Sequence, residues 1–387
     1  MQDATIDKLH IFITMFVISF IMSIQGPIFT PYASMLGASS IMIGIMLSAS
    51  QLTDLTGNLM VGPLVDKYGK IIFISIPIFI SGLLYVAHGF IADYTSLLVL
   101  RAINGFALAF LMPAAFALIS GYAKNSRQQG KNMAIVGILG VIADIIAPIL
   151  GGKLGTTIGY ANTYSIMGYA LLVIAVYTVI FLRDRQLLSV KNKRAKATNL
   201  LTVFQNTQLQ LVYLTGFAVM YIHGVINYEV PYLTVEKGYS TLRTGQLFGF
   251  EAVGTLASLS LFFLHRYDPI NRMMFGLFWL CMSLAAFFNG LLDLPLSLFL
   301  MGFCFGLVMP AAGTAVTNAV PSTEHGKAFG VLSAVYSLGM IASSFLTAII
   351  RQAVSPYFIA FLVGMMILTV IGFIKFSMPK TIRDSRY

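Results

Sequence analysis

The sequence predicts an all-α membrane protein whose twelve transmembrane helices form two similar six-helix halves. Of its 387 residues, 58% are hydrophobic and 10% are charged, whereas a soluble domain carries about 25% charged residues. Apolar runs of about 20 residues, the length that spans a bilayer, recur along the whole chain. The stretch Leu111–Ala115 (LMPAA) is nearly repeated by Val308–Ala312 (VMPAA), about half the chain length later. Such a repeat on membrane segments is typical of transporters built from two halves.

Each apolar run is expected to be a helix, because a lone helix satisfies its own backbone hydrogen bonds in lipid. The twelve predicted spans cover residues 10–34, 41–62, 71–91, 95–122, 132–152, 161–182, 208–233, 241–264, 271–291, 295–320, 327–350 and 356–377. The first six form a bundle over residues 1–182, and the last six form a second bundle over residues 207–387. Residues 183–206 between them are rich in Lys and Arg and are predicted to be a cytoplasmic linker.

The charges between the spans predict the orientation. Most of the 24 Lys and Arg residues fall on one side of the membrane if both termini lie on that side. Cytoplasmic loops carry such an excess, so both termini are expected in the cytoplasm, with the chain in the plasma (inner) membrane. The net charge of +10 is thereby explained without nucleic-acid binding.

A charged motif lies between the second and third spans. It reads GPLVDKYGK and includes Gly62, Asp66, Lys67, Gly69 and Lys70. This motif resembles the loop signature of the major facilitator superfamily, Gly-x-Leu-x-Asp-Arg-x-Gly-Arg, with lysines in place of the arginines. The resemblance implies the major facilitator fold and a gate latch that stabilises an outward-open state. A basic loop without a gating role is the alternative.

The fourth span carries an arginine in a second motif. Leu97-x-x-x-Arg101-x-x-Asn104-Gly105 resembles the family pattern Leu-x-x-x-Arg-x-x-Gln-Gly. An arginine within a span is costly, so Arg101 is expected to face the bundle interior and to have a partner. The alternative is an arginine that extends to the membrane surface.

The fifth span ends in Pro148, Gly151 and Gly152. This segment resembles the antiporter motif of drug/proton exporters, Gly-x-x-x-Gly-Pro-x-x-Gly-Gly, with alanine at the first two glycines. Small residues allow close helix packing, and the resemblance implies that the partner is the eighth span.

Three ionisable residues, Arg101, Asp144 and Glu251, are expected at one level of the outer half of the membrane. An ion pair between Arg101 and Asp144 would make both residues tolerable there. An approach of Asp144 to Glu251 would instead favour a protonated carboxyl that carries a proton. The sequence leaves both arrangements open.

Asp54 lies deeper, about fourteen residues, or 21 Å, from the outer end of the second span. Gln51, Asp54 and Asn58 share one helix face. A charge at mid-bilayer costs roughly 2.5–3.5 kcal/mol, so the carboxyl must be paired, hydrated or protonated. We expect Asp54 on a water-filled cavity, where it binds and releases protons; a neutral acid bonded to a neighbouring helix is the alternative.

Polar residues on three spans are candidates for the substrate cavity. They are Gln25 in the first span, Gln51 and Asn58 in the second, and His223 and Asn227 in the seventh. His223 and Asn227 are four residues apart and so share a helix face. Some of the 30 phenylalanines and 20 methionines are expected to complete an adaptable cavity.

Together these features predict a proton-coupled efflux antiporter for small amphipathic molecules or drugs, working by alternating access, with proton coupling at Asp54, Asp144, Glu251 and Arg101. The alternatives are a dedicated exporter or flippase of a cellular product such as a metallophore or glycolipid, and a metabolite symporter. No phosphate-binding loop or metal-ligand spacing occurs, so no enzymatic activity, cofactor or metal is expected. The expected partners are a small-molecule substrate, protons and the lipid bilayer, with the chain as a monomer.

Overall fold

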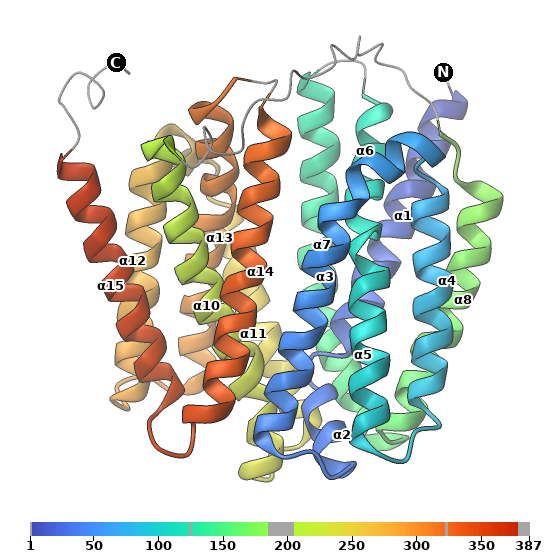
Figure 1. Ribbon diagram of the computed structural model, residues 1–387, viewed down its shortest axis with the longest axis horizontal. Coiled ribbons are helices and arrows are strands. Elements are labelled where there is room, and N and C mark those ends of the chain that lie inside the picture. Colours follow the sequence, from blue (N-terminus) through green and yellow to red (C-terminus); the bar gives the residue numbers. More distant parts are fainter. Residues whose placement is uncertain (1, 124–125, 185–204, 322–323, 378–387) are drawn as a thin grey trace. The chain divides into compact units, whose positions relative to one another are not determined.

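The computed structural model describes residues 2–123, 126–184, 205–321 and 324–377. Within these ranges, the side chains of residues 2–4, 61–63, 66, 126–127, 262, 265 and 376–377 are not described. The described residues are almost entirely helical, and no strand occurs among them (Figure 1). This agrees with the all-α architecture that the sequence predicts.

Each predicted span coincides with a helix or with a pair of successive helices. The first six spans correspond to α1 (Gln2–Ile24) with α2 (Phe29–Met35), α3 (Ser40–Tyr68), α4 (Ile72–His88), α5 (Tyr94–Ala109) with α6 (Leu111–Gly121), α7 (Ser126–Thr157) and α8 (Tyr160–Phe181). The last six correspond to α10 (Thr207–Glu236), α11 (Thr241–Leu259) with the 3₁₀ turn η1 (Phe262–Arg266), α12 (Pro269–Phe288), α13 (Leu294–Ala319), α14 (His325–Ile350) and α15 (Pro356–Ser377).

Three of the predicted spans are interrupted, the eighth of the twelve at residues 260–261, between α11 and η1. The first breaks at residues 25–28, where Gly26 and Pro27 follow Gln25. The fourth was expected to be continuous, but α5 ends at Ala109 and α6 begins at Leu111. Proline lacks an N–H and its ring clashes with the carbonyl four residues earlier, so Pro113 disfavours a regular helix at Ala109.

Helices begin at similar capping residues in both halves of the sequence. Ser39 accepts a hydrogen bond from Met42 N before α3, and Ser240 accepts one from Arg243 N before α11. Asp93 and Asp293 do the same for Ser96 N in α5 and Leu296 N in α13. Side-chain oxygens at this position satisfy backbone N–H groups that have no partner within the helix.

The chain forms two compact units. The first comprises residues 1–191, 226–253 and 344–349, and the second comprises the remaining residues. Within the first unit, α1 packs on α7, α3 on α5, and α4 on α8. Within the second unit, α12 packs on both α13 and α15. The division into residues 1–182 and 207–387 stays a prediction, and most of the proposed linker, residues 185–204, lies outside the described residues.

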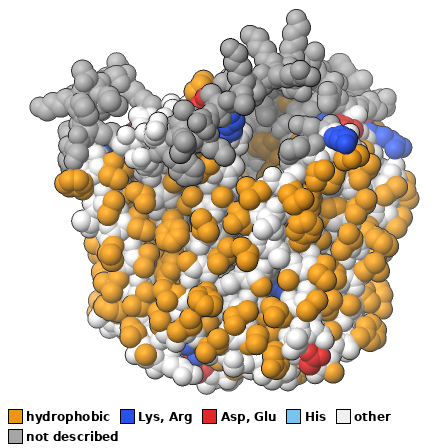
Figure 2. Space-filling model, viewed as in Figure 1, with side chains coloured by type: hydrophobic (Ala, Val, Ile, Leu, Met, Phe, Trp, Pro, Cys, Tyr) orange, Lys and Arg blue, Asp and Glu red, His pale blue; other side chains and the backbone are white. Residues whose placement is uncertain are grey.

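The surface is that of a multi-pass membrane protein. Among the described residues, nine helices are long and apolar enough to cross a membrane. Apolar side chains cover the middle of the face shown in Figure 2, and most charged side chains on that face lie toward its two ends. Such an apolar band between charged ends fits the environment of a bilayer, whose hydrocarbon core is about 30 Å thick.

Candidate functional site

Asp54 lies on α3, at the helix pair that α3 makes with α5. Its side chain is half-buried, and its Oδ2 accepts a hydrogen bond of 3.0 Å from Asn58 Nδ2. The helices approach closely, since a Cβ on Gly57 would lie 2.5 Å from Ala109 Cβ and a Cβ on Gly105 would lie 2.3 Å from Ser50 O. The hydrogen-bond partner of the carboxylate thus lies on the same helix, and this helix packs tightly on α5. Gln51 is half-buried one turn earlier.

Arg101 lies on α5 and is buried, with 8% of its surface exposed. Its Nη1 donates a hydrogen bond to Gln25 Oε1, at the break between α1 and α2. Its guanidinium carbon is 4.3 Å from the centre of the Phe29 ring. The sequence left two arrangements open for Arg101, an ion pair with Asp144 and a side chain that extends to the membrane surface. The structure shows neither, because Arg101 is buried and its hydrogen-bond partner is Gln25.

Asp144 and Glu251 lie on two helices that pack closely. Asp144 on α7 is exposed, and its Oδ1 accepts a hydrogen bond of 2.6 Å from Ser23 Oγ of α1. Glu251 on α11 is buried, with 6% of its surface exposed. The contact between α7 and α11 brings both residues to a similar level, because Gly249, two residues before Glu251, lies against Ile145.

The contact between α7 and α11 depends on small residues. A Cβ on Gly245 would lie 2.1 Å from Pro148 O, and a Cβ on Gly152 would lie 2.3 Å from Thr241 O. Nearer to Glu251, Gly249 lies against Ile145, one residue beyond Asp144. Gly151 packs on α1 instead, where a Cβ would lie 2.2 Å from Ile24 O.

A buried aromatic cluster next to Arg101 was missed by the sequence analysis. It consists of Tyr32, Tyr85, His88 and Tyr164, all at most 1% exposed. The rings of His88 and Tyr164 stack with centres 4.8 Å apart, and Tyr85 is edge-on to both at 5.6 Å. Tyr32 donates a hydrogen bond of 2.5 Å to the backbone oxygen of His88. The signal available was the dipeptide Pro31-Tyr32, which recurs as Pro231-Tyr232.

His223 and Asn227 lie on α10, and both are half-buried. The His223 ring is edge-on to Phe305 of α13, with centres 4.8 Å apart. Both residues lie within the helix, and their role in a cavity stays a prediction.

The charged motif spans the end of α3 and the turn to α4. The side chain of Asp66 and the surroundings of Gly62 are not described. Lys67 is exposed and lies over the ring of Tyr68. Gly69 ends the helix with φ +92°, a conformation that favours glycine. Lys70 Nζ forms an ion pair of 2.8 Å with Asp184, which follows α8.

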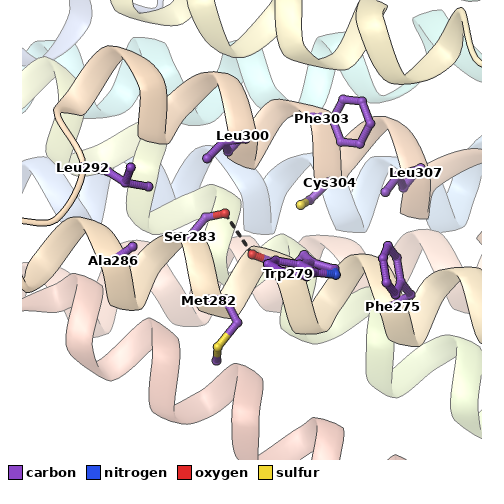
Figure 3. A pocket seen from close by; sticks show the side chains of 10 residues that line it. All are labelled: Phe275, Trp279, Met282, Ser283, Ala286, Leu292, Leu300, Phe303, Cys304 and Leu307. Atoms are coloured by element: carbon purple, nitrogen blue, oxygen red, sulfur yellow. Dashed lines mark hydrogen bonds between the residues drawn. The ribbon is translucent and has the colours of Figure 1, made fainter.

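A separate apolar groove lies between α12 and α13 (Figure 3). Its volume is about 470 Å³, and its lining comprises Phe275, Trp279, Met282, Ser283, Ala286, Leu292, Leu300, Phe303, Cys304 and Leu307. The hydroxyl of Ser283 donates to the backbone oxygen of Trp279 and so offers little polarity to a ligand. None of the predicted cavity residues lines this groove.

The comparisons with known proteins agree on the kind of protein. The family model described as Major Facilitator Superfamily matches residues 11–291. An uncharacterized MFS-type transporter of Methanocaldococcus jannaschii is 24% identical and covers 85% of this chain and 86% of its own. A multi-drug resistance efflux pump PmrA homolog of Lactococcus lactis is 24% identical, over 76% of this chain and 74% of its own. The staphylopine export protein of Staphylococcus aureus is 22% identical, over 89% and 90%.

A solved structure shows the same fold. A mutant of the nucleoside transporter NupG superposes with a TM-score of 0.80 at 14% identity, covering 95% of this chain and 99% of its own. The helices, the family match and this superposition lead to one conclusion. The chain belongs to the Major Facilitator Superfamily and is a membrane transporter of small molecules rather than an enzyme.

Proposed function

We propose that this transporter exports small amphipathic molecules in exchange for protons. The observation that carries the proposal is Asp54, an acid in the interior of a membrane helix. Among the described residues no cation pairs with it, and its recorded hydrogen bond comes from the neutral amide of Asn58. Ionised and neutral forms of such a carboxyl differ little in their contacts but greatly in their solvation.

This difference provides a means of coupling. The ionised form needs water, and burying it in an apolar site costs roughly 2.5–3.5 kcal/mol. The neutral form avoids this cost. Proton binding at Asp54 therefore shifts the equilibrium between conformations that hydrate the carboxyl and conformations that bury it, which is the requirement for alternating access.

The direction of transport is proposed from two further observations. The segment from Ala143 to Gly152 resembles the antiporter motif, and its Gly152 packs on α11. The PmrA homolog, a relative over about three quarters of the chain, is described as a multi-drug resistance efflux pump. Both favour export with proton entry over import by symport.

Export of one dedicated product is a second candidate. It is favoured by the similarity to the staphylopine export protein, which extends over 89% of this chain. In both candidates the energy comes from protons at Asp54, so they differ only in substrate.

The decisive experiment is transport in everted membrane vesicles. Fluorescent amphipathic dyes and a metallophore are offered with and without an imposed proton gradient. We expect gradient-driven transport by the wild type and its loss in Asp54→Asn, which keeps the side-chain shape and the bond to Asn58 but cannot ionise. Asp93→Asn, the same change outside the spans, is the matched control.

Two results would contradict the proposal. If Asp54→Asn keeps its dependence on the gradient, Asp54 is not the coupling residue. If an uncoupler leaves transport by the wild type unchanged, the antiport mechanism is wrong. Transport of the metallophore alone would favour the second candidate.

The orientation and assembly state are also proposals. The distribution of Lys and Arg supports cytoplasmic termini in the plasma membrane, and a two-bundle transporter can work as a monomer. Reporter fusions at each terminus test the first, and light scattering of the purified protein tests the second.

A further inference from the structure

Arg101 is a buried cation that is held by neutral groups. It exposes 8% of its surface, its Nη1 bonds to the Gln25 carboxamide, and its guanidinium lies over the Phe29 ring. No acid pairs with it in the part of the chain that the structure describes, and its buried Nε lacks a hydrogen-bond acceptor there. A buried charge normally has a charged partner. The Arg101 guanidinium would therefore be stabilised by an anion that binds next to it.

The oxygen of Gln25 occupies the place where such an anion would bind best. Two donors converge on this single atom, since Arg101 Nη1 and the hydroxyl of Tyr85, at 3.1 Å, both bond to Oε1. Asn104 Nδ2 donates a hydrogen bond of 3.5 Å to the Tyr85 oxygen and so helps to position it. A carboxylate oxygen in the same position would accept stronger, charge-assisted bonds from the same donors.

The aromatic residues next to these donors further favour a carboxylate over the neutral carboxamide. Tyr85, His88 and Tyr164 are fully buried and exclude water from one side of Arg101. Charges attract more strongly where the surrounding dielectric constant is low. Within the described residues, the hydroxyl of Tyr164 also lacks a hydrogen-bond partner, which adds a further donor to the same aromatic cluster.

Gln25 can leave this position without disrupting a helix. It lies in the break between Ile24, the last residue of α1, and Phe29, the first residue of α2. Its side chain is only half-buried, so part of it is accessible to a ligand. A ligand could exchange for the carboxamide by a side-chain movement alone.

We propose that Arg101 recognises a carboxylate on the transported molecule, and that Gln25 occupies the site in the empty transporter. This rests on the proposed function, because it names the charge that the exported amphipathic molecule carries. The substrate class is an amphipathic organic acid whose carboxylate replaces Gln25 Oε1 between Arg101 and Tyr85, while its apolar part stays outside the polar site.

The test is binding of benzoate to the purified full-length protein in lipid nanodiscs, with methyl benzoate as the uncharged control. We expect the wild type to bind benzoate roughly tenfold more tightly than the ester, because only the acid makes charge-assisted bonds. Gln25→Ala removes the competing carboxamide and should strengthen benzoate binding. Gln25→Glu provides an internal carboxylate for Arg101 and should abolish the preference for benzoate.

Arg101→Gln removes the cation and should also abolish the preference for benzoate, and the Gln25 variants keep the proposal testable if this variant does not fold. Equal affinities for benzoate and its ester in the wild type would overturn the proposal, as would unchanged benzoate binding in Gln25→Glu. The vesicle assay with a cationic dye distinguishes this failure from that of the proposed function. Proton-driven dye export without a benzoate preference refutes the carboxylate site alone, whereas a benzoate preference without any proton dependence refutes the antiport mechanism alone.

Discussion

The pair formed by α3 and α5 and the pair formed by α11 and α13 use the same packing with different chemistry. Glycine brings the helices together in both, since a Cβ on Gly105 would lie 2.3 Å from Ser50 O and one on Gly254 would lie 2.0 Å from Phe299 O. Gly44 of α3 recurs as Gly245 in α11, 201 residues later, and the same offset aligns Asp54 with Thr255 in the second pair. The hydroxyl of Thr255 donates to Gly302 O at 3.0 Å and so ties the two helices together.

The difference shows how one scaffold can serve two purposes. Thr255 uses its polar group to join two helices, whereas Asp54 bonds to Asn58 on its own helix. The carboxyl can therefore gain or lose a proton without breaking a bond between helices. The same contrast holds for Arg101, whose aligned residue in the second half is the buried Leu298. At both aligned positions the first half has an ionisable side chain and the second half has a neutral one.

Exchanging the residues at these aligned positions should have the largest effect. We expect Asp54→Thr to fold, because a threonine hydroxyl in a helix can bond to a carbonyl one turn earlier. It should lose its dependence on the proton gradient by roughly 5–150-fold, the usual range of a coupling free energy. Vesicle transport with and without the gradient measures this. A gradient dependence equal to that of the wild type would refute the contrast between the two helix pairs.

The reciprocal change is the control. Thr255→Asp places a carboxylate against Gly302 O, an acceptor, and should lower stability without adding a second proton dependence. A gain of coupling in this variant would show that the position, rather than its surroundings, creates the function.

Filling the glycine contacts should destabilise both helix pairs alike. Gly105→Ala and Gly254→Ala each introduce a Cβ that overlaps backbone oxygen, with an expected cost of roughly 1–3 kcal/mol. Gly313→Ala on α13 is the control, because nothing lies within 4 Å of the added Cβ. Thermal unfolding in detergent, followed by size-exclusion chromatography, measures the three variants. A cost for only one of the two pairs would mean that the shared packing is not equivalent.

A smaller effect is expected where helix ends meet in each unit. Lys70 pairs with Asp184 in the first unit, whereas Lys375 Nζ bonds to the neutral Asn271 in the second. A double-mutant cycle with Lys70→Ala and Asp184→Ala should give about 0.2–1 kcal/mol, decreasing with salt. The cycle with Lys375→Ala and Asn271→Ala should depend less on salt. Equal salt dependence in both cycles would contradict this difference.

The smallest effect concerns the cap of α5. The backbone N–H of Ser96 stabilises the ionised form of Asp93 and lowers the pKa of this exposed carboxyl from 3.8. Since the pKa is lower in the folded state, Asp93 contributes stability above its unfolded pKa and loses it as the pH falls below about 4. Asp93→Asn preserves a capping oxygen and should weaken the decline of the melting temperature between neutral pH and pH 3. An unchanged decline would show that the cap charge does not matter.

Much of the fold could be predicted because membrane helices are encoded locally. Hydrophobic length located the spans. The break before α6 was not predicted. Pro113 and Pro310 occur in the same repeated stretch, yet α13 continues through Pro310 while the helix is interrupted at Phe110. Whether a proline breaks a helix depends on whether neighbouring groups satisfy the freed carbonyl, which the sequence does not show.

The candidate site was predicted less completely. The burial of Arg101 followed from its charge, but its partner did not, because Gln25 is 76 residues away along the chain. The aromatic cluster of Tyr32, Tyr85, His88 and Tyr164 comes from helices α2, α4 and α8, and no local pattern links them. Composition and spacing identify which residues are costly in a membrane. The contacts that offset this cost can be identified only from the structure.

The capping residues at the start of four helices have a consequence for how the protein is made. Ser39, Asp93, Ser240 and Asp293 each define where a helix begins by a bond to a residue three positions later. These bonds involve no other helix, so they can form as soon as each segment leaves the ribosome. The boundaries of these four membrane segments can thus be set during synthesis, before each segment packs against other helices.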